Sequence, residues 1–210
     1  MKALLLIDLQ NDLCFGGAIE VPEGDAVIPV ANRLIPDFEQ VIATRQWHPA
    51  DHSSFAAMYP WRRPGQIIEI DGQPQLLWTM HCVQGSFGAE FSPKLHISQI
   101  NKIIDTGTSA QADNYSAFSD VDQKIDTGLL NYLHSKHITA LYILGLPIET
   151  SVKNTALQAL ESGFDTYVFL DGCRGEMRPA TEEMIEGGVT MLRLDQWEKY
   201  RHQQDKIRLL

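Results

Sequence analysis

Short apolar runs alternate with helix-like segments along almost the whole chain, and this alternation constrains the fold more than any other feature. Residues 3–7 form a continuous apolar run that ends in Asp8, as expected of a strand buried on both faces with a polar residue at its carboxyl end. Further strands are predicted at residues 41–45, 102–105, 140–145, 166–170 and 190–194, and helices at residues 25–38, 122–134, 151–162 and around 181–186. The alternation predicts an α/β fold in three layers, with a mostly parallel sheet and helices on both faces.

No linker or internal repeat divides the chain, so residues 1–210 are expected to form a single domain. Residues 47–93 are predicted to be irregular, because they are rich in proline, glycine, histidine and aromatic residues. A loop of this length inside a compact domain is usually functional, so we expect this segment to help form a site. The polar tail from residue 198 is expected to be helical or frayed.

Charge and cysteine content exclude several classes of function. The net charge is −10 and no basic cluster is present, so neither nucleic acid nor an anionic membrane is an expected partner. No apolar stretch approaches the roughly 20 residues of a spanning helix. The three cysteines, Cys14, Cys82 and Cys173, are odd in number and far apart, which favours a reducing cytoplasm over a disulfide framework.

Polar residues follow several of the predicted strands. Asp8, Gln46 and Thr106 stand at strand ends, as does the turn at residues 145–151. Ligands of parallel α/β sheets bind at the carboxyl ends of the strands. Asp8 there is either a general base or a structural acceptor for loop amides. Ser151 is either a nucleophile exposed on a strand-turn-helix element or the cap of the following helix.

Three histidines, His48, His52 and His81, fall within the irregular segment. Neutral imidazole is a good ligand for zinc, iron and related ions, so the three could form a metal site. The alternative is that they are surface or hydrogen-bonded histidines.

Several short motifs, taken together and in order, resemble those of bacterial nicotinamidases/pyrazinamidases in the isochorismatase-like cysteine-hydrolase superfamily. The similar segments are Asp8-Leu9-Gln10-Asn11-Asp12, Gly16-Gly17, Val21-Pro22-Glu23-Gly24-Asp25, Trp47-His48-Pro49 with His52, Trp78 with His81-Cys82-Val83-Gln84, Tyr115-Ser116-Ala117-Phe118, Gly145-Leu146 and Asp171-Gly172-Cys173-Arg174-Gly175. They span nearly the whole chain. The resemblance implies hydrolysis of nicotinamide to nicotinate and ammonia by an Asp-Lys-Cys triad.

The family pattern places two of the three triad members on changed residues. Asp8 matches the catalytic aspartate, but Thr106 stands at the position of the lysine and Ser151 at that of the cysteine. The resemblance also implies a substrate pocket that includes Leu13, Trp78, Tyr115, Leu146 and Pro147, and a cis peptide bond before Pro147. Leu13 replaces the aromatic residue that helps to cover the substrate ring in the family.

The family holds one divalent metal ion, and the resemblance places its ligands on His48, His52 and His81 together with Gln46, which replaces an aspartate. Zinc, iron or manganese is therefore the expected metal, if one binds. The ligand implied is a small molecule such as a pyridine carboxamide, and a homo-oligomer is expected because relatives are often oligomeric.

Three functions follow from these substitutions. The first is a nicotinamidase-like protein that keeps its pocket but is inactive or strongly impaired as a cysteine amidase. The second is an active amide hydrolase that uses Ser151 with Asp8, or a water bound to a metal at the histidines. The third is an interaction protein with a vestigial pocket.

Overall fold

A parallel sheet of six strands forms the centre of the computed structural model, which describes residues 1–70, 72–119 and 126–208, with residues 202–208 described by backbone alone. The strands are β1 Lys2–Ile7, β2 Val41–Gln46, β5 Lys102–Thr106, β6 Ala140–Gly145, β7 Asp165–Cys173 and β8 Thr190–Leu192. Their order is β5-β2-β1-β6-β7-β8, and every neighbouring pair is parallel. The predicted α/β fold with a mostly parallel sheet is confirmed.

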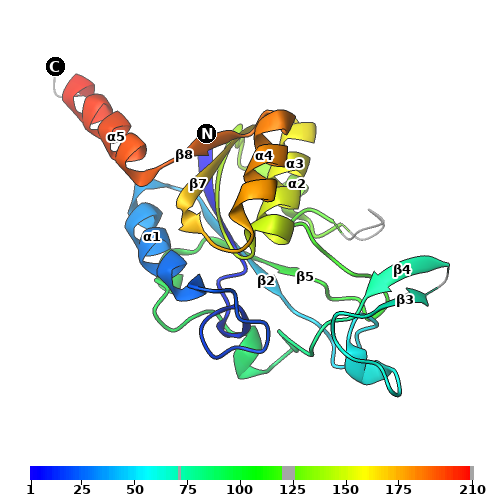
Figure 1. Ribbon diagram of the computed structural model, residues 1–210. Coiled ribbons are helices and arrows are strands. Elements are labelled where there is room, and N and C mark those ends of the chain that lie inside the picture. The colour runs from blue at the N-terminus through cyan, green and yellow to red at the C-terminus, as the bar shows by residue number, and fades with distance from the viewer. Residues whose placement is uncertain (71, 120–125, 209–210) are drawn as a thin grey trace.

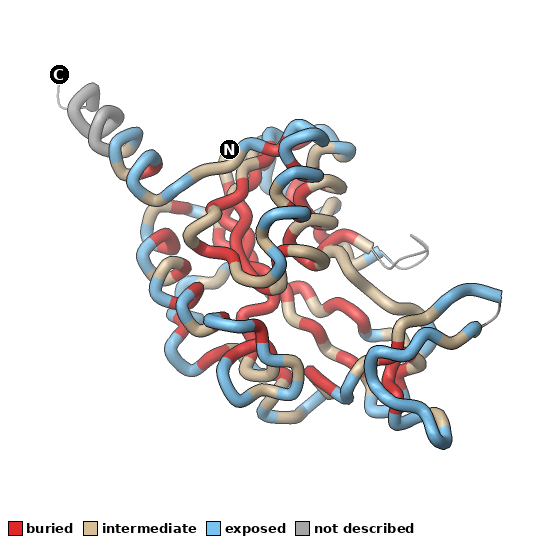
Figure 2. The backbone as a smooth tube through the Cα atoms, viewed as in Figure 1, coloured by how far each residue is buried: buried red, intermediate tan, exposed pale blue. Residues whose placement is uncertain are grey.

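Helices cover both faces of the sheet, which explains the unbroken apolar runs. The helices are α1 Val27–Leu34, α2 Leu129–Ser135, α3 Lys153–Glu161, α4 Met177–Gly187 and α5 Leu194–Arg208. Figure 1 shows α1 and α5 on one side of the sheet and α2, α3 and α4 on the other. The central strands are accordingly buried on both faces (Figure 2), and the side chains of Leu4, Leu5 and Leu6 in β1 have no exposed surface.

Two predicted helices are shorter in the structure. The helix expected at residues 25–38 is α1 alone, flanked by 3₁₀ turns at Gly24–Ala26 and Ile35–Asp37. Pro36 explains its end, since proline cannot continue the helical hydrogen bonds, whereas Pro29 is tolerated in the first turn. Of the helix expected at residues 122–134, residues 122–125 lie outside the described part. The described helix α2 begins only at Leu129, after Gly128 in a left-handed conformation.

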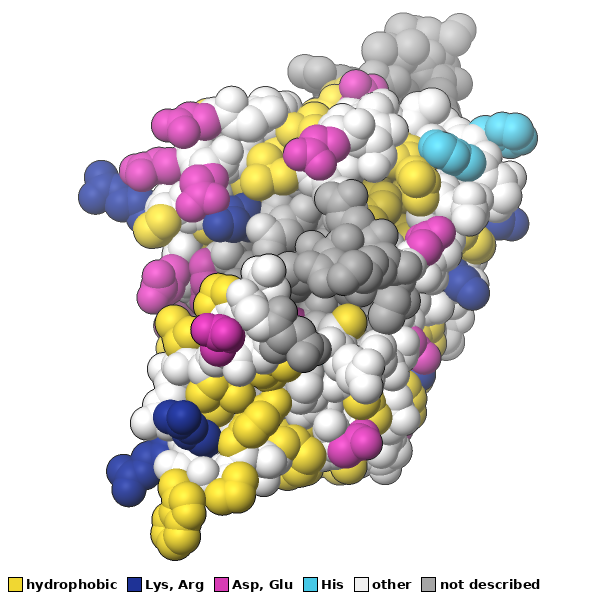
Figure 3. All heavy atoms as spheres, turned by 90° about the vertical axis from the view of Figure 1, so that its right-hand side faces the viewer, with side chains coloured by type: hydrophobic (Ala, Val, Ile, Leu, Met, Phe, Trp, Pro, Cys, Tyr) yellow, Lys and Arg dark blue, Asp and Glu magenta, His cyan; other side chains and the backbone are white. Residues whose placement is uncertain are grey.

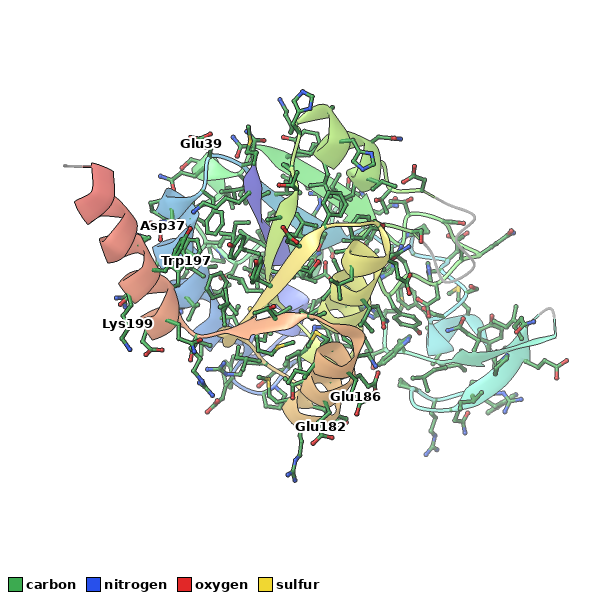
Figure 4. All side chains as sticks on the ribbon, turned by 90° about the horizontal axis from the view of Figure 1, so that it is seen from above. Asp37, Glu39, Glu182, Glu186, Trp197 and Lys199 are labelled. Carbon is green, nitrogen blue, oxygen red and sulfur yellow. The ribbon has the colours of Figure 1, made fainter. Side chains whose placement is uncertain are left out.

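The chain end is helical earlier than expected. The strand predicted at residues 190–194 ends at Leu192, because Leu194 begins α5. Trp197 fixes the start of this helix, donating from Nε1 to an Asp37 carboxylate oxygen at 2.8 Å and stacking on Phe38 with ring centroids 5.2 Å apart. Figure 4 labels Asp37 and Trp197, which meet where α5 joins the domain.

The segment at residues 47–93 is only partly irregular. It contains an antiparallel hairpin of β3 Ile67–Ile70 and β4 Gln73–Leu76, which extends from the domain in Figure 1. In Figure 3, which views this side of the molecule, hydrophobic side chains gather on the lower part of the face, and Lys and Arg are scattered without forming a basic stripe. No helix in the described ranges is long and apolar enough to cross a membrane.

The strand order reverses direction between β1 and β6, so their carboxyl ends form the switch point at which ligands bind in such sheets. Ile7 pairs with Gly145 at this edge. Gly145 has a φ of 146°, and a Cβ built on it would lie 2.2 Å from the Ile7 carbonyl oxygen. Only glycine therefore allows the two strands to end side by side.

Replacing Gly145 by alanine should destabilise the fold more than the same change at Gly163. Gly163 also has a positive φ, of 88°, but nothing lies within 4 Å of the point where a Cβ would stand, so Gly163→Ala should cost only the left-handed conformation, about 1–2 kcal/mol. Gly145→Ala adds a clash with backbone and should cost about 1–3 kcal/mol more. Urea unfolding of the two variants measures the difference, and equal losses would contradict this account of the β1–β6 edge.

Candidate functional site

The polar residues predicted at the strand ends meet at one edge of the sheet. Asp8 follows β1 directly, Gln46 and Thr106 are paired at the ends of β2 and β5, and Ser151 lies in the turn after β6. The Ser151 side chain lies near enough to the Asp8 carboxyl group to lower the pKa of that group. Segments that are far apart in sequence therefore converge on Asp8.

Asp8 is almost fully buried and its carboxyl oxygens are well partnered. Thr44 Oγ1 donates to Oδ1 at 2.5 Å and Gln46 Nε2 donates to Oδ2 at 2.9 Å. Burial raises the pKa of Asp8, and the hydrogen bonds from Thr44, Gln46 and Ser151 oppose that rise. The effect of burial is the larger one, so the pKa of Asp8 lies above its ordinary value and the protonated carboxyl group is favoured more than it would be in water.

Ser151 does not act as the helix cap that the sequence left open. It lies in a π-helical turn, Ile148–Val152, which follows the cis peptide bond between Leu146 and Pro147 that the resemblance implied. The N-cap of α3 is Val152, with no side-chain cap hydrogen bond. The Ser151 hydroxyl is therefore available to Asp8 and to the adjoining hollow.

Thr106 takes no part in the network around Asp8. Its hydroxyl donates to the Arg45 carbonyl oxygen at a long 3.5 Å. The Arg45 side chain is directed elsewhere, pairing with Asp105 at 2.8 Å and stacking over the Trp47 ring at 3.8 Å. The position that the resemblance assigns to a catalytic lysine is thus uncharged.

A hollow of about 60 Å³ opens beside Ser151, between the sheet edge and the segment at residues 47–93. Trp78, Tyr115 and Pro147 supply its apolar walls, and Gln46, His48 and His81 line its floor. No lysine or arginine of the described chain lines it. Leu13 and Leu146 have no exposed surface and pack in the core, and they do not line the hollow.

A chain of hydrogen bonds fixes the aromatic wall. Trp78 Nε1 donates to the Tyr115 hydroxyl at 3.3 Å, and that hydroxyl donates to Asp113 Oδ2 at 2.5 Å. Gln75 Nε2 donates to the same carboxylate oxygen at 2.9 Å. Asp113 also lines the hollow, and its carboxylate holds the Tyr115 hydroxyl directly and the Trp78 ring through that hydroxyl.

His48 and His81 point the same atom at Gln46. The Nδ1 atoms face carbonyl oxygens, of Gly107 at 3.0 Å for His48 and of Thr79 at 2.7 Å for His81. Their Nε2 atoms lie 3.3 Å and 3.1 Å from Gln46 Oε1. In a neutral ring the Nδ1–H donates to the carbonyl oxygen and Nε2 carries a lone pair, so the two Nε2 atoms and Gln46 Oε1 are acceptors that face one another, while Gln46 Nε2 donates to Asp8.

His52 is oriented differently. Its Nε2 faces the Ala112 carbonyl oxygen at 3.2 Å, and its Nδ1 accepts from the backbone N–H of Ser54 at 3.2 Å. The ring packs edge-on against His48, with centroids 4.6 Å apart. Both nitrogens of His52 are therefore engaged with backbone groups away from Gln46.

Burial lowers the pKa of all three histidines. The pKa of His48 falls to about 3, chiefly by burial and further through the neighbouring His81 and His52. Burial is also the main cause of the lowered pKa of His52 and of His81. The three imidazoles are neutral near pH 7, as metal ligands and buried hydrogen-bonded histidines both are.

The donor set fits a divalent ion only in part. His48 and His81 have the arrangement of metal-ligating histidines, with Nδ1 directed to a carbonyl oxygen and Nε2 directed inward. His52 is turned away, and Gln46 offers a neutral oxygen near the two Nε2 atoms in place of a carboxylate. Within residues 1–70, 72–119 and 126–208, no group of three or more His, Cys, Asp or Glu is placed to hold a metal ion. A metal on His48, His52, His81 and Gln46 stays a prediction.

Two buried polar residues of the site were not predicted from the sequence. Thr44 lies two residues before Gln46 in β2, on the same face of the strand, and both donate to Asp8. The two-residue spacing of Thr44 and Gln46 along a predicted strand is the pattern from which Thr44 could have been identified as a site residue. Gln10 exchanges two hydrogen bonds of 2.8 Å with the backbone N–H and C=O of Gln46, and no local pattern indicates this pairing.

The stability of the protein should fall as the pH drops below the ordinary histidine pKa. Between pH 6.5 and about 3 the unfolded chain binds a proton at residue 48 that the folded chain does not bind, so the free energy of unfolding decreases by up to about 1.4 kcal/mol per pH unit. The raised pKa of Asp8 acts in the opposite sense above pH 3.8, because there the folded state keeps the proton. Urea unfolding at pH 7, 6 and 5 should give a smaller slope for His48→Asn than for the wild type. The exposed His96→Asn control should keep the wild-type slope, and equal slopes for all three proteins would contradict the assignment.

Comparison with known proteins places the chain in a family. Residues 2–186 match the isochorismatase domain family. The nicotinamidase of Escherichia coli (strain K12) is 44% identical over 212 residues, which cover 94% of this chain and 97% of the relative. The yeast nicotinamidase bound to the inhibitor nicotinaldehyde has a TM-score of 0.84 at 30% identity, covering 92% of this chain and 100% of the other.

A third relative carries a metal. The pyrazinamidase of Pyrococcus horikoshii in complex with zinc has a TM-score of 0.74 at 33% identity, and the match covers 92% of this chain and 99% of the other. That structure fits a divalent metal in the family, as the resemblance implied. With a family match over most of its length and a relative at 44% identity, the chain belongs to the nicotinamidase family of isochorismatase-like proteins.

Proposed function

We propose that this nicotinamidase-family protein keeps a small-molecule pocket but is inactive or strongly impaired as a cysteine amidase. The observation that supports this most directly is the partner of the buried Asp8. In this chain Asp8 faces the hydroxyl of Ser151, and no lysine or arginine of the described chain lines the hollow. Ser151 and Thr106 occupy the positions that the family pattern gives to cysteine and lysine.

The chemistry of the two changed residues argues for a large loss of rate. A cysteine thiol ionises near pH 8.5, and a neighbouring cation lowers its pKa further, whereas a serine hydroxyl needs a strong adjacent base. Burial raises the pKa of Asp8 and so makes its carboxylate a stronger base than in water, but no lysine or arginine of the described chain lines the hollow to balance a developing anion. Loss of one member of a catalytic unit can reduce kcat on the order of a million-fold, and further losses add little.

The pocket itself remains suited to a flat polar ligand. Trp78 and Tyr115 offer ring faces, and Gln46, Ser151 and Asp113 offer hydrogen bonds around them. A pyridine carboxamide has matching chemistry, with an aromatic ring and both a donor and an acceptor. We take such a small molecule as the ligand class, with Asp8 and Ser151 facing its polar group.

One observation favours a second candidate function. Ser151 lies beside the buried Asp8 carboxyl group, and a serine nucleophile with a carboxylate base requires such a neighbour. In that case the protein is a slow amide hydrolase and not an inactive one. The buried, unpaired cysteines Cys14, Cys82 and Cys173 suit the reducing cytoplasm in which we place either activity.

Ammonia release from nicotinamide tests the proposal directly. The wild type should be inert or several orders of magnitude slower than the Escherichia coli nicotinamidase assayed beside it. Ser151→Cys combined with Thr106→Lys should raise the rate by about 100-fold or more, because it supplies a thiolate and its cation. The control pairs Thr106→Lys with Ser135→Cys, an exposed position, and should gain nothing. A wild-type rate near that of the relative would disprove impairment, and a rate that falls in Ser151→Ala would establish the serine hydrolase instead.

Nicotinamide binding tests the pocket independently of turnover. Nicotinamide should raise the melting temperature of the wild type, and Trp78→Ala should weaken binding by about tenfold, since an aromatic contact contributes roughly 0.5–1.5 kcal/mol beyond buried area. Trp61→Ala is the matched control, because Trp61 lies in the same segment and is 98% exposed. Calorimetric titration of the three proteins gives the affinities. Equal affinities for wild type and Trp78→Ala would place the ligand elsewhere.

A further inference from the structure

We propose that the hollow beside Ser151 selects planar aromatic ligands by their charge, and that the carboxylate of Asp113 sets this selectivity. Cations bind most tightly, neutral amides less tightly and anionic acids least. The preferred class is then an aromatic amidine, in which a positively charged amidinium group stands where a pyridine carboxamide has its amide. This selectivity rests on the proposed function, which supplies the pocket, and adds to it the charge of the ligand.

The described residues that line the hollow include one carboxylate, Asp113, and no lysine or arginine. None of the ion pairs between described residues includes Asp113. Its oxygens accept from neutral donors instead, which are the Tyr115 hydroxyl at 2.5 Å, Gln75 Nε2 at 2.9 Å and the backbone N–H of Asn114 at 2.9 Å. These hydrogen bonds hold the carboxylate in place but do not neutralise it. Its charge therefore attracts a cation in the hollow and repels an anion.

The aromatic wall of the hollow favours the same sign of charge. The faces of Trp78 and Tyr115 are electron-rich, and indole attracts cations more strongly than any other aromatic side chain. Both rings are tied to the carboxylate, because Trp78 Nε1 donates to the Tyr115 hydroxyl and that hydroxyl donates to Asp113. A planar cation in the hollow is thus attracted by the ring faces and by the carboxylate. A neutral ligand of the same shape gains only the contact with the rings.

The floor of the hollow adds three acceptors. The Nε2 atoms of His48 and His81 carry lone pairs in the neutral rings, and Gln46 Oε1 lies 3.3 Å and 3.1 Å from them. The donor end of the Gln46 amide is engaged with Asp8. The N–H groups of an amidinium complement these acceptors, whereas a carboxylate would bring further acceptors to them. A divalent ion at this point would reverse the sign of the charge, so the experiment below includes metal content as a controlled variable.

The selectivity has a consequence for any amide that is hydrolysed in the hollow. Hydrolysis converts a neutral carboxamide and water into a carboxylate and ammonium. The carboxylate has lost the N–H donors of the amide and gained a negative charge. The Asp113 carboxylate and the acceptors of the floor then repel it, and no lysine or arginine of the described lining retains it. The acid is therefore the form that the hollow binds least well.

Pyridine-3-carboxamidine, nicotinamide and nicotinate test the order, because they share one ring and are cationic, neutral and anionic at pH 7. Each is titrated calorimetrically into the protein as purified, with its metal content measured, and again after chelator treatment. The amidine should bind at least about tenfold more tightly than nicotinamide, and nicotinate at least about tenfold more weakly. Asp113→Asn, which keeps an acceptor for Tyr115, should lower the preference for the amidine about tenfold and change nicotinamide affinity less than about threefold. Glu69→Gln, an exposed loss of one negative charge on the β3–β4 hairpin, should keep the wild-type order.

Charge selection is overturned if the amidine binds no more tightly than nicotinamide, or if nicotinate binds as tightly as nicotinamide, both before and after chelation. An unchanged order in a folded Asp113→Asn protein shows that Asp113 does not set it. Asp113→Ser is the second neutral variant should Asp113→Asn not fold. Loss of the order while nicotinamide still binds leaves the proposed function standing. Nicotinamide turnover at the rate of the Escherichia coli relative, with the order intact, disproves impairment alone.

Discussion

The burial of one carboxyl group, that of Asp8, organises the whole carboxyl edge of the sheet. A buried carboxyl group is stable only if it is protonated or surrounded by donors. Here the donors come from the end of β2 through Thr44 and Gln46 and from the turn after β6 through Ser151. The switch point between β1 and β6 brings these segments together, and Gly145 allows the close approach that it requires. The fold and the site are therefore linked through a single residue.

Most of the fold could be predicted because the sheet is buried on both faces. Burial on both sides makes each strand an unbroken apolar run, and the run in β1 is followed by a polar residue at the functional edge. The β3–β4 hairpin was missed because its residues are exposed or half-buried, so no apolar run indicates it. The early start of α5 was missed for a different reason. Trp197 docks on Phe38 and Asp37, and such a contact between distant segments leaves no local periodicity.

The site was predictable in its members but not in their orientations. Asp8, Gln46 and Ser151 could be named because they follow buried strands. The direction of His52 depends on Ala112 and Ser54, and the direction of Gln46 depends on Gln10, His48 and His81. No spacing rule contains those contacts. Leu13 likewise matches a pocket position of the family pattern, yet it is fully buried, because pocket walls are set by three-dimensional packing.

The substitutions in the site are electrostatically consistent with one another. In our proposal Thr106, Gln46 and Ser151 stand where the family pattern has lysine, aspartate and cysteine, so the three changes would remove one positive charge, one negative charge and one readily ionised thiol. Each neutral replacement fits a buried environment in which the pKa of Asp8 is raised and the pKa values of the histidines are lowered. An ionic cluster needs all of its members, because one charge left alone in a buried site is strongly destabilising. Loss of one charged member therefore favours loss of the others, which leaves Asp8 with the neutral donors Thr44 and Gln46 as its partners.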